Sequence, residues 1–305
     1  MTISVLIPTY NGAGKIMNLL HCLGKQTLLP DEIIVLIDGS KDGTEELIAE
    51  AVFLLKARTK VLWQPNGGRA KVRNAAAAHA GGDLLIFFDD DMLPLPDCIK
   101  QHHDWQLTHE RAFVTGGLEE PVDETTSDIL RYKASLSRKW NKELEGHPDG
   151  LLEGDSAFFT AANFSVPAGL FRELKGFDER LNDAEDYELC VRAQRAGVRF
   201  YFLPDAFAWH NDPLTCSAYI RRLRQYAQAH RKLQVLMPEL PVRYKQPVPQ
   251  GFKKMFFKLF LNRFWIRSVD NGFWTRLLPL SLRYRLYDYV ITANGVYFPD
   301  KVSLS

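Results

Sequence analysis

The sequence predicts an α/β protein with a mostly parallel sheet, followed by a helical, basic C-terminal extension. Over the first ninety residues, short apolar runs alternate with helical stretches, a pattern typical of a parallel sheet with helices on both faces. The apolar runs are uninterrupted, as strands covered on both faces require. From residue 219 onward the pattern becomes helical, basic and aromatic instead.

Turn and stop signals place the N-terminal elements in order. Pro8 ends the first strand, Asp38-Gly39-Ser40 stops the second, and Gly81-Gly82 closes the third helix. Thr44 is the predicted cap of the second helix. The predicted strands cover residues 3–7, 33–37, 61–63 and 84–88, and the helices between them cover 13–23, 44–57 and 68–80.

The second half of the chain is less regular. We predict strands over residues 112–115, 158–166 and 199–203, and a helix over 184–196 that Asn182 or Asp183 caps and Gly197 closes. The polar segment 121–154 receives no assignment. We expect one catalytic domain over residues 1–212 and a basic, aromatic-rich helical region over 213–305.

Polar side chains follow three of the predicted strands, at the point where each strand ends. Thr9 and Asn11 follow the first strand, Asp38 the second, and Asp89-Asp90-Asp91 the fourth. In an open α/β sheet these strand ends share one edge, where ligands bind. Three separate segments are therefore expected to line one crevice.

The three aspartates predict a cation site. On extended backbone residues i and i+2 point to the same side, so Asp89 and Asp91 could both reach one Mg²⁺ or Mn²⁺ ion, which prefer oxygen ligands. The alternative is a solvated acidic turn. Three acids directly after a buried strand favour the metal site.

The segment Asn66–Asn74 opens a helix with two glycines and two arginines. Glycines let a backbone approach a ligand closely, and a helix N-terminus favours anions. Arg69 and Arg73 lie on one helical face, which a solvent-facing basic helix would explain equally well. The segment matches neither G-x-G-x-x-G nor the P-loop, which disfavours dinucleotide and NTPase readings.

Taken in order, these segments resemble the family-2 inverting glycosyltransferases of the GT-A fold, a Rossmann-like nucleotide-sugar-binding architecture. The resemblance covers about residues 1–212. The matching segments are Ile7-Pro8-Thr9-Tyr10-Asn11, Gln26-Thr27, Asp38 to Thr44, Asn66-Gly67-Gly68, Arg73-Asn74, Asp89-Asp90-Asp91, Gly176 to Glu179, Glu185 to Leu189 and Trp209-His210.

The resemblance implies roles for particular residues. Asp186 is the expected general base, Glu185 helps to position the acceptor, and Asp38 faces a uracil-like base. Asp91, Asp89 and His210 are the expected metal ligands, and Asn163 and Trp209 are expected near the sugar or acceptor. The implied nucleotide contacts are Pro8, Thr9, Tyr10, Asn11, Asp38, Asn66, Gly68, Arg73, Asp89 and Asp90.

Three positions depart from the family's pattern. Ile37 replaces the usual first acid of the Asp-Asp-Gly-Ser element, so base recognition depends more on Asp38. Val72 replaces the usual alanine. Asp90 occupies a position that is often small or apolar, which leaves open which two aspartates bind the metal.

The resemblance implies a metal-dependent hexosyl- or N-acetylhexosaminyltransferase. Its donor would be a nucleotide-sugar, with a UDP-sugar favoured, and its acceptor a saccharide or lipid-linked saccharide of a surface polysaccharide or glycolipid. One alternative is a transferase that acts on a polyprenyl phosphate, whose ionised acceptor needs no base. Another is a non-catalytic, membrane-associated scaffold with the same fold.

Charge is distributed unevenly along the chain. After His210, sixteen Lys and Arg face five Asp and Glu, which gives +11; since the whole chain carries +1, the first 210 residues carry −10. Basic and aromatic residues over 251–266 favour an in-plane helix on an anionic membrane surface. The alternative is a helix that packs on the catalytic domain. Nucleic-acid binding lacks a recognition motif.

Four dispersed cysteines suggest a reducing compartment rather than disulfides or zinc. The N-terminus lacks the pattern of a signal peptide, and no apolar run reaches the ~18 residues of a membrane span. We therefore expect a cytoplasmic protein, peripheral at the inner face of the plasma membrane if the tail binds lipid. The sequence does not specify an oligomeric state.

Overall fold

The computed structural model describes residues 1–52, 55–240, 249–272 and 274–303. These residues form two compact units. The first comprises Met1–Pro121 and Ser137–Asn211, and the second comprises Val122–Leu136 and the chain from Asp212 onward. The second unit therefore takes an internal segment as well as the C-terminal region.

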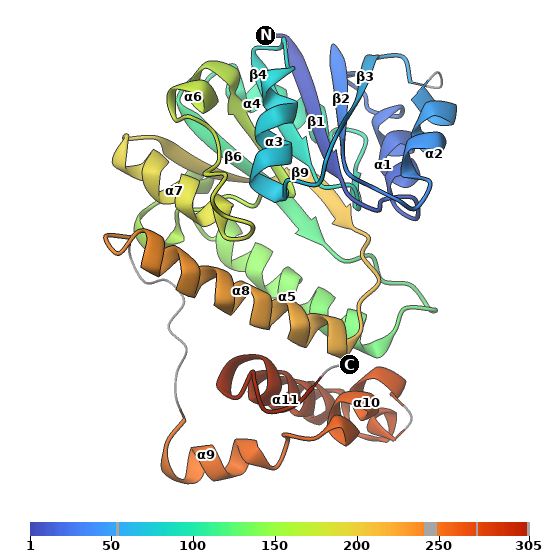
Figure 1. Cartoon of the computed structure of the whole chain (residues 1–305), viewed down its shortest axis with the longest axis vertical. Helices are drawn as coiled ribbons and strands as arrows, with labels where there is room; N and C mark the ends of the chain where they lie inside the picture. Colours follow the sequence, from blue (N-terminus) through green and yellow to red (C-terminus); the bar gives the residue numbers. More distant parts are fainter. Residues whose placement is uncertain (53–54, 241–248, 273, 304–305) are drawn as a thin grey trace. The chain divides into compact units, whose positions relative to one another are not determined.

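The strands of the first unit form one sheet in the order β3-β2-β1-β4-β8-β6-β9-β5, with β7 paired to β9, within the described residues (Figure 1). Pairing is parallel from β3 to β4 and between β6 and β9, whereas β8, β5 and β7 pair antiparallel with their neighbours. The strands are β1 (Ile3–Thr9), β2 (Glu32–Asp38), β3 (Arg58–Gln64), β4 (Leu84–Phe88), β5 (Met92–Pro94), β6 (Ala112–Glu119), β7 (Leu151–Leu152), β8 (Asn163–Pro167) and β9 (Arg199–His210).

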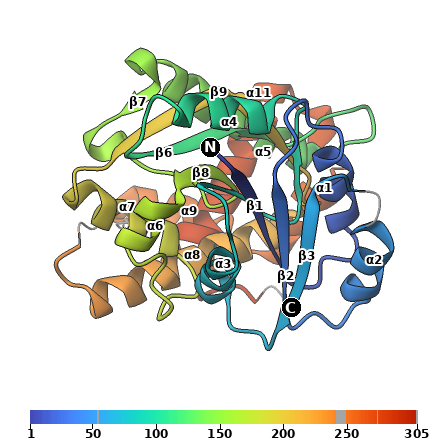
Figure 2. The same ribbon diagram turned by 90° about the horizontal axis from the view of Figure 1, so that it is seen from above.

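Helices cover both faces of this sheet, which confirms the α/β class. Figure 2 shows α1 and α2 on one side of β1–β3 and α3 on the other. Each face has its own apolar core, because β1, β2 and β4 are buried along their whole length. The helices and helical turns are α1 (Ile16–Leu23), α2 (Thr44–Ala51), α3 (Arg69–Ala78), α4 (Cys98–Gln106), α5 (Asp128–Glu145), η2 (Pro148–Gly150), η3 (Gly154–Ser156), α6 (Ala168–Glu173) and α7 (Glu185–Arg195).

Several boundaries differ from the predictions. The second helix ends at Ala51 rather than 57, β8 begins at Asn163 rather than 158, and β9 continues to His210 rather than stopping at 203. The unassigned segment 121–154 contains the 18-residue helix α5. Pro204 does not end β9, because β9 pairs with β6 again beyond it, at Ala208 and Trp209, after a shift of register.

The second unit is helical, and α8, α10 and α11 pack with the start of α5 around an apolar core that includes Ile220, Val269 and Tyr287. Asp128 of α5 anchors it: its carboxylate accepts hydrogen bonds from Arg283 at 2.9 Å and Tyr287 at 2.6 Å. The elements are α8 (Cys216–Leu236), α9 (Gly251–Lys258), α10 (Arg263–Asn271), η4 (Thr275–Leu277), α11 (Leu280–Ile291) and η5 (Thr292–Tyr297).

The predicted helix over 251–266 is in fact two helices. α9 ends at Lys258, and α10 begins after Asn262, whose side chain accepts the N–H of Phe264 at 2.9 Å as an N-cap. Among the described residues, no helix combines the length and hydropathy that crossing a membrane would need.

Candidate functional site

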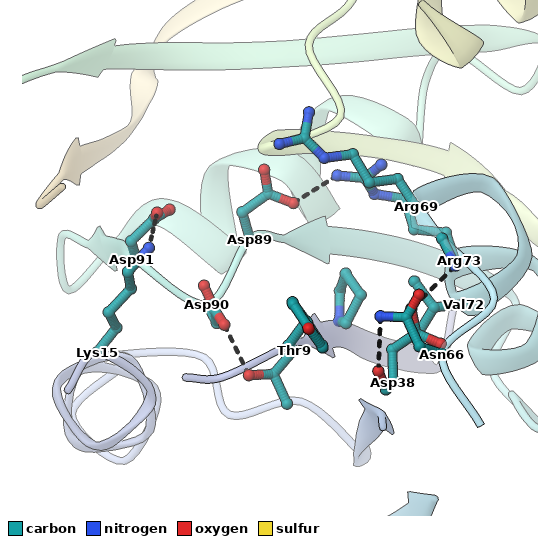
Figure 3. A pocket seen from close by; sticks show the side chains of 13 residues that line it. Thr9, Lys15, Asp38, Asn66, Arg69, Val72, Arg73, Asp89, Asp90 and Asp91 are labelled. Carbon is teal, nitrogen blue, oxygen red and sulfur yellow. Dashed lines mark hydrogen bonds and ion pairs between the residues drawn. The ribbon is translucent and has the colours of Figure 1, made fainter. Parts of the chain in front are cut away.

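A cavity of about 270 Å³ lies at the carboxyl ends of β1, β2 and β4, where the sequence predicts a crevice. Figure 3 shows its side chains, which come from the ends of β1 and β2, the loops after β3 and β4, the residue before α1 and the first turns of α3. All the predicted nucleotide contacts line it except Asn11. The lining residues are Pro8, Thr9, Tyr10, Lys15, Asp38, Asn66, Gly68, Arg69, Val72, Arg73, Asp89, Asp90 and Asp91.

Asn11 shapes the loop after β1 instead of lining the cavity. Its backbone is left-handed (φ 51°), its N–H donates to Ser40 at 2.9 Å, and its side-chain oxygen accepts the N–H of Lys41 at 3.0 Å. The next residue, Gly12, donates its N–H to the Thr44 hydroxyl at 2.9 Å. The prediction that Thr44 caps α2 was wrong, because the N-cap residue is Gly43. Thr44 instead ties the start of that helix to this loop.

Gly12 is required by close packing. A Cβ at this position would lie 2.2 Å from the Thr9 hydroxyl oxygen and 2.7 Å from a carboxylate oxygen of Asp90. Those two groups are hydrogen bonded to each other at 2.6 Å. The glycine thus lets Asp90 bond back onto the end of β1.

Asp38 holds the glycine-rich loop that precedes α3. Its two carboxylate oxygens accept the N–H groups of Gly67 at 2.8 Å and Gly68 at 3.0 Å. Gly68 has φ 86°, a conformation that L side chains rarely adopt. Asp38 lines the cavity but is only 3% exposed, and its carboxylate positions the loop through these two hydrogen bonds.

The three aspartates after β4 point toward different partners. Residues 90 and 91 form a turn, closed by a hydrogen bond from the Met92 N–H to the Asp89 carbonyl at 3.1 Å. The assumption of extended backbone was therefore wrong here. Figure 3 shows Asp89 directed to Arg73, Asp90 to Thr9 and Asp91 to Lys15.

Asp91 and His210 are brought together by the pairing of β5 with β9. The His210 Nε2 atom lies 3.5 Å from the Asp91 Oδ1 atom, and its Nδ1 lies 3.7 Å from Glu120. On the other side, Lys15 Nζ lies 3.1 Å from Asp91 Oδ2. Although His210 does not line the cavity, it contacts the aspartate that does.

A divalent cation fits this pair of side chains. Carboxylate and imidazole are ligands that Mn²⁺ accepts, and the buried Asp91 Oδ1 accepts no hydrogen bond from the residues that the structure describes. Mg²⁺ and Mn²⁺ commonly combine one or two protein ligands with phosphate oxygens and water. Within the described ranges no group of three His, Cys, Asp or Glu side chains is arranged as a cation cage.

Arg73 links the cavity to the start of α7. Its guanidinium donates to Asp89 at 2.6 Å and to Glu185 at 2.6 Å, and its side chain is 4% exposed. Burial opposes the charge of Arg73, but the two carboxylates outweigh it and raise the pKa of the arginine. A continuous charged chain therefore connects Asp89 with the residue next to Asp186.

Asp186, beside Glu185 at the start of α7, has a raised pKa. Burial, and then repulsion from Glu185, raise its pKa to about 6, against the hydrogen bond that it accepts from the Tyr187 N–H. The residue before α7 is Ala184, in a left-handed conformation with φ 62°. The prediction that Asn182 or Asp183 caps α7 was wrong, because Ala184 is the N-cap residue. Its strained backbone sets the direction in which Glu185 and Asp186 enter the helix.

The two residues predicted near the sugar differ in position. Asn163 is fully buried: its amide donates to the carbonyl oxygens of Gly117 at 3.2 Å and Ala206 at 2.9 Å, and its oxygen contacts His102 at 3.0 Å. Its side chain is committed to the sheet and does not line the cavity. Trp209 is half-buried on β9, next to His210 and in edge contact with Phe207.

Lys15 and Arg69 line the cavity without having been among the predicted contacts. The sequence predicts Arg69 only as part of a basic helical face. Lys15 follows the short loop Gly12-Ala13-Gly14 and immediately precedes α1, so its signal was a lone cation just beyond a strand end that already carried polar residues.

Comparison with known proteins identifies relatives of this arrangement. The model of "Glycosyl transferase family 2" matches residues 4–171. The chain is 27% identical over 266 residues to the "Uncharacterized glycosyltransferase YfnE" of Bacillus subtilis, covering 72% of this chain and 67% of that protein. It is 26% identical over 305 residues to the poly(ribitol-phosphate) beta-N-acetylglucosaminyltransferase TarS of Staphylococcus aureus, covering 94% of this chain but only 47% of TarS.

Solved structures show the same fold. The TarS fragment 1–349 in complex with UDP superposes with a TM-score of 0.53 at 20% identity, covering 96% of this chain and 90% of that one. The mannosyltransferase PcManGT from Pyrobaculum calidifontis, in complex with GDP-Man and Mn²⁺, superposes with a TM-score of 0.61 at 19% identity, covering 98% and 88%. These likenesses confirm the GT-A fold that the sequence predicts.

Proposed function

This chain belongs to glycosyl transferase family 2, and we propose that it transfers a sugar, with inversion, from a UDP-sugar to a saccharide or lipid-linked saccharide of a surface polysaccharide. One observation carries the proposal: Arg73 joins Asp89, in the cavity, to Glu185, beside Asp186, with both contacts at 2.6 Å. A donor site and a proton acceptor are thereby held at a fixed separation. UDP is favoured because TarS, which matches most of this chain by sequence, binds UDP.

The donor's nucleotide occupies the cavity in this proposal. The N-terminus of α3, with Arg69 beside it, supplies positive potential for phosphate oxygens. Asp38 keeps the Gly67-Gly68 loop in place, and Thr9 and Tyr10 line the wall formed by the end of β1. The sugar then points toward the start of α7.

Proton transfer falls to Asp186. Its carboxylate accepts the proton of the acceptor hydroxyl as the oxygen attacks the anomeric carbon, from the face opposite to the departing diphosphate. A pKa of about 6 makes Asp186 ionised at neutral pH yet more basic than an ordinary aspartate. Glu185 is held by Arg73 and acts as a positioning residue.

Asp91 and His210 are the proposed holders of a divalent cation, Mn²⁺ or Mg²⁺. Such an ion offsets negative charge on a departing diphosphate. Asp89 is instead engaged by Arg73, so we assign the direct contact to Asp91.

Nucleotide binding tests the proposal. We expect titration calorimetry to detect UDP binding that Mn²⁺ strengthens and that Asp91→Asn abolishes, with GDP binding more weakly. Asp205→Asn, an exposed aspartate of the same unit, is the matched control and should bind like the unmodified protein. Failure of the unmodified protein to bind either nucleotide, with or without Mn²⁺, would refute the proposal and favour a non-catalytic scaffold.

We also propose that α9 contacts an anionic membrane surface. Phe256 and Phe257 pack against the core of the second unit, but Phe252, Met255 and Leu259 are 76%, 62% and 66% exposed along one stripe. Lys254 and Lys258 are exposed beside the stripe. Exposed apolar side chains flanked by lysines are typical of helices that lie in the membrane interface.

Sedimentation with vesicles tests this second proposal. We expect the protein to bind vesicles that contain phosphatidylserine at low salt, and to be released as salt is raised. Equal binding to neutral vesicles, or no binding to either, would contradict it.

A further inference from the structure

Lys15 brings a cation to the aspartate that we assign to metal binding. It is the residue before α1, and its Nζ lies 3.1 Å from Asp91 Oδ2. Figure 3 shows it reaching Asp91 from the side of the cavity opposite to Arg69 and Arg73. The Lys15 side chain is 33% exposed and the Asp91 side chain 11%, so this pair is only partly screened by water.

The other acids of the cavity already have different partners. Asp38 accepts hydrogen bonds from two backbone N–H groups. Asp89 accepts a hydrogen bond from the Arg73 guanidinium, and Asp90 accepts one from the Thr9 hydroxyl. Asp91 instead pairs with Lys15 at one oxygen, and the His210 ring lies 3.5 Å from the other. A lysine ammonium on a flexible four-carbon chain can leave such a pair without moving the backbone.

A divalent ion at Asp91 and the ammonium of Lys15 would repel each other at this separation. Like charges a few ångströms apart in a partly buried site cost several times what they cost in water. The diphosphate of a donor changes that balance, because its oxygens offer the ammonium a new anionic partner in the same cavity.

We propose that Lys15 and the divalent cation are alternative partners of Asp91, exchanged when the donor's diphosphate arrives. Before donor binding, Lys15 offsets the charge of Asp91 and weakens the binding of a metal ion without nucleotide. After donor binding, the ammonium would contact the diphosphate, which would leave Asp91 able to hold the cation. This inference rests on the proposed nucleotide-sugar function and adds an order to it: the metal enters with the nucleotide rather than ahead of it.

The substitution Lys15→Met tests the contribution of the lysine's charge. The Lys15 side chain makes no capping hydrogen bond to α1, so Lys15→Met keeps a similar shape and leaves the helix start intact. The matched control is Lys25→Met, which removes the same charge from an exposed position beyond the end of the same helix and outside the cavity.

The test is the Mn²⁺ affinity of each protein, measured by calorimetry without nucleotide and again at saturating UDP. Without nucleotide, we expect Lys15→Met to bind Mn²⁺ roughly tenfold more tightly than the unmodified protein, because a charge-assisted hydrogen bond no longer has to break. With UDP, that advantage should disappear or reverse. Lys25→Met should match the unmodified protein in both conditions.

Two results would overturn the exchange: an unchanged or weaker Mn²⁺ affinity of nucleotide-free Lys15→Met, or a gain that is equally large with and without UDP. Failure of the proposed function is separately visible. It would appear as absence of UDP binding by the unmodified protein. The comparison of Mn²⁺ affinities without nucleotide tests the role of Lys15 independently of UDP binding.

Discussion

The two units use charged residues in opposite ways. In the first unit, the charged side chains around the cavity pair with one another, as Arg73 does with Asp89 and Glu185. In the second unit, Lys254 and Lys258 are exposed beside apolar side chains that are exposed as well. In our two proposals this difference corresponds to two kinds of recognition: a fixed set of charged side chains would select a small anion by geometry, whereas an open basic and apolar face would bind an extended surface by area and charge density.

The largest expected effect is on the chemistry of the first unit. Asp186→Asn removes the proposed proton acceptor while keeping its size, so we expect the rate of sugar transfer to fall by about 10²- to 10⁴-fold. UDP affinity should change little, because Asp186 does not line the cavity. Initial rates and calorimetry measure the two quantities. Retained activity would instead indicate an acceptor that is already ionised, such as a polyprenyl phosphate.

Removing the link between cavity and helix should cost stability as well. Arg73→Met leaves the buried Glu185 and the neighbouring Asp89 without their common partner, so we expect the free energy of unfolding to fall by about 3 kcal/mol. Urea denaturation measures it. Arg111→Met is the control, because it breaks an exposed pair with Glu173 and should leave the denaturation midpoint nearly unchanged.

The second unit offers the complementary test. Replacing Lys254 and Lys258 by glutamine should weaken partition into anionic vesicles about 30-fold, at about 1 kcal/mol for each lysine. Transfer to a soluble acceptor should remain unchanged. The same two substitutions at Lys25 and Lys139, which are exposed elsewhere, should leave partition intact. If the control weakened partition equally, net charge rather than the α9 face would explain binding.

The smallest effect is that of pH. The pKa of Asp186 is raised to about 6, so its protonated, inactive form persists to a higher pH than it would in an ordinary aspartate. We expect kcat/KM to rise about tenfold per pH unit below pH 6 and to level off above it. The residual activity of Asp186→Asn should lack this rise, which separates Asp186 from other groups that titrate in this range.

Periodicity in the sequence was sufficient to predict the part of the fold that forms the cavity. Uninterrupted apolar runs located β1, β2 and β4, but the prediction that Pro8 ends the first strand was wrong, because β1 continues through Pro8 to Thr9 and pairs there with β2. α5 was missed because its apolar residues are few. They recur at helical spacing within a polar segment, as Ile129, Tyr132, Leu136, Trp140 and Leu144.

The internal contacts of the site could not be predicted in the same way. The turn at Asp90 and Asp91 follows a backbone hydrogen bond from the Asp89 N–H to the carbonyl of Ala162, more than seventy residues away, at 3.2 Å. Similarly, His210 reaches Asp91 through the pairing of β5 with β9. Residue types and order predicted which side chains gather, but long-range pairing decides which of them touch.

The division of α5 between the two units has a consequence for protein synthesis. Asp128 emerges from the ribosome 155 residues before Arg283 and 159 before Tyr287, its partners in the finished second unit. At roughly 5–20 residues per second, that interval lasts on the order of 8–30 s. Throughout it, the core that eventually covers Ile129 and Tyr132 is incomplete. The nascent chain must therefore carry the start of α5 without its complete core until Arg283 and Tyr287 have been added.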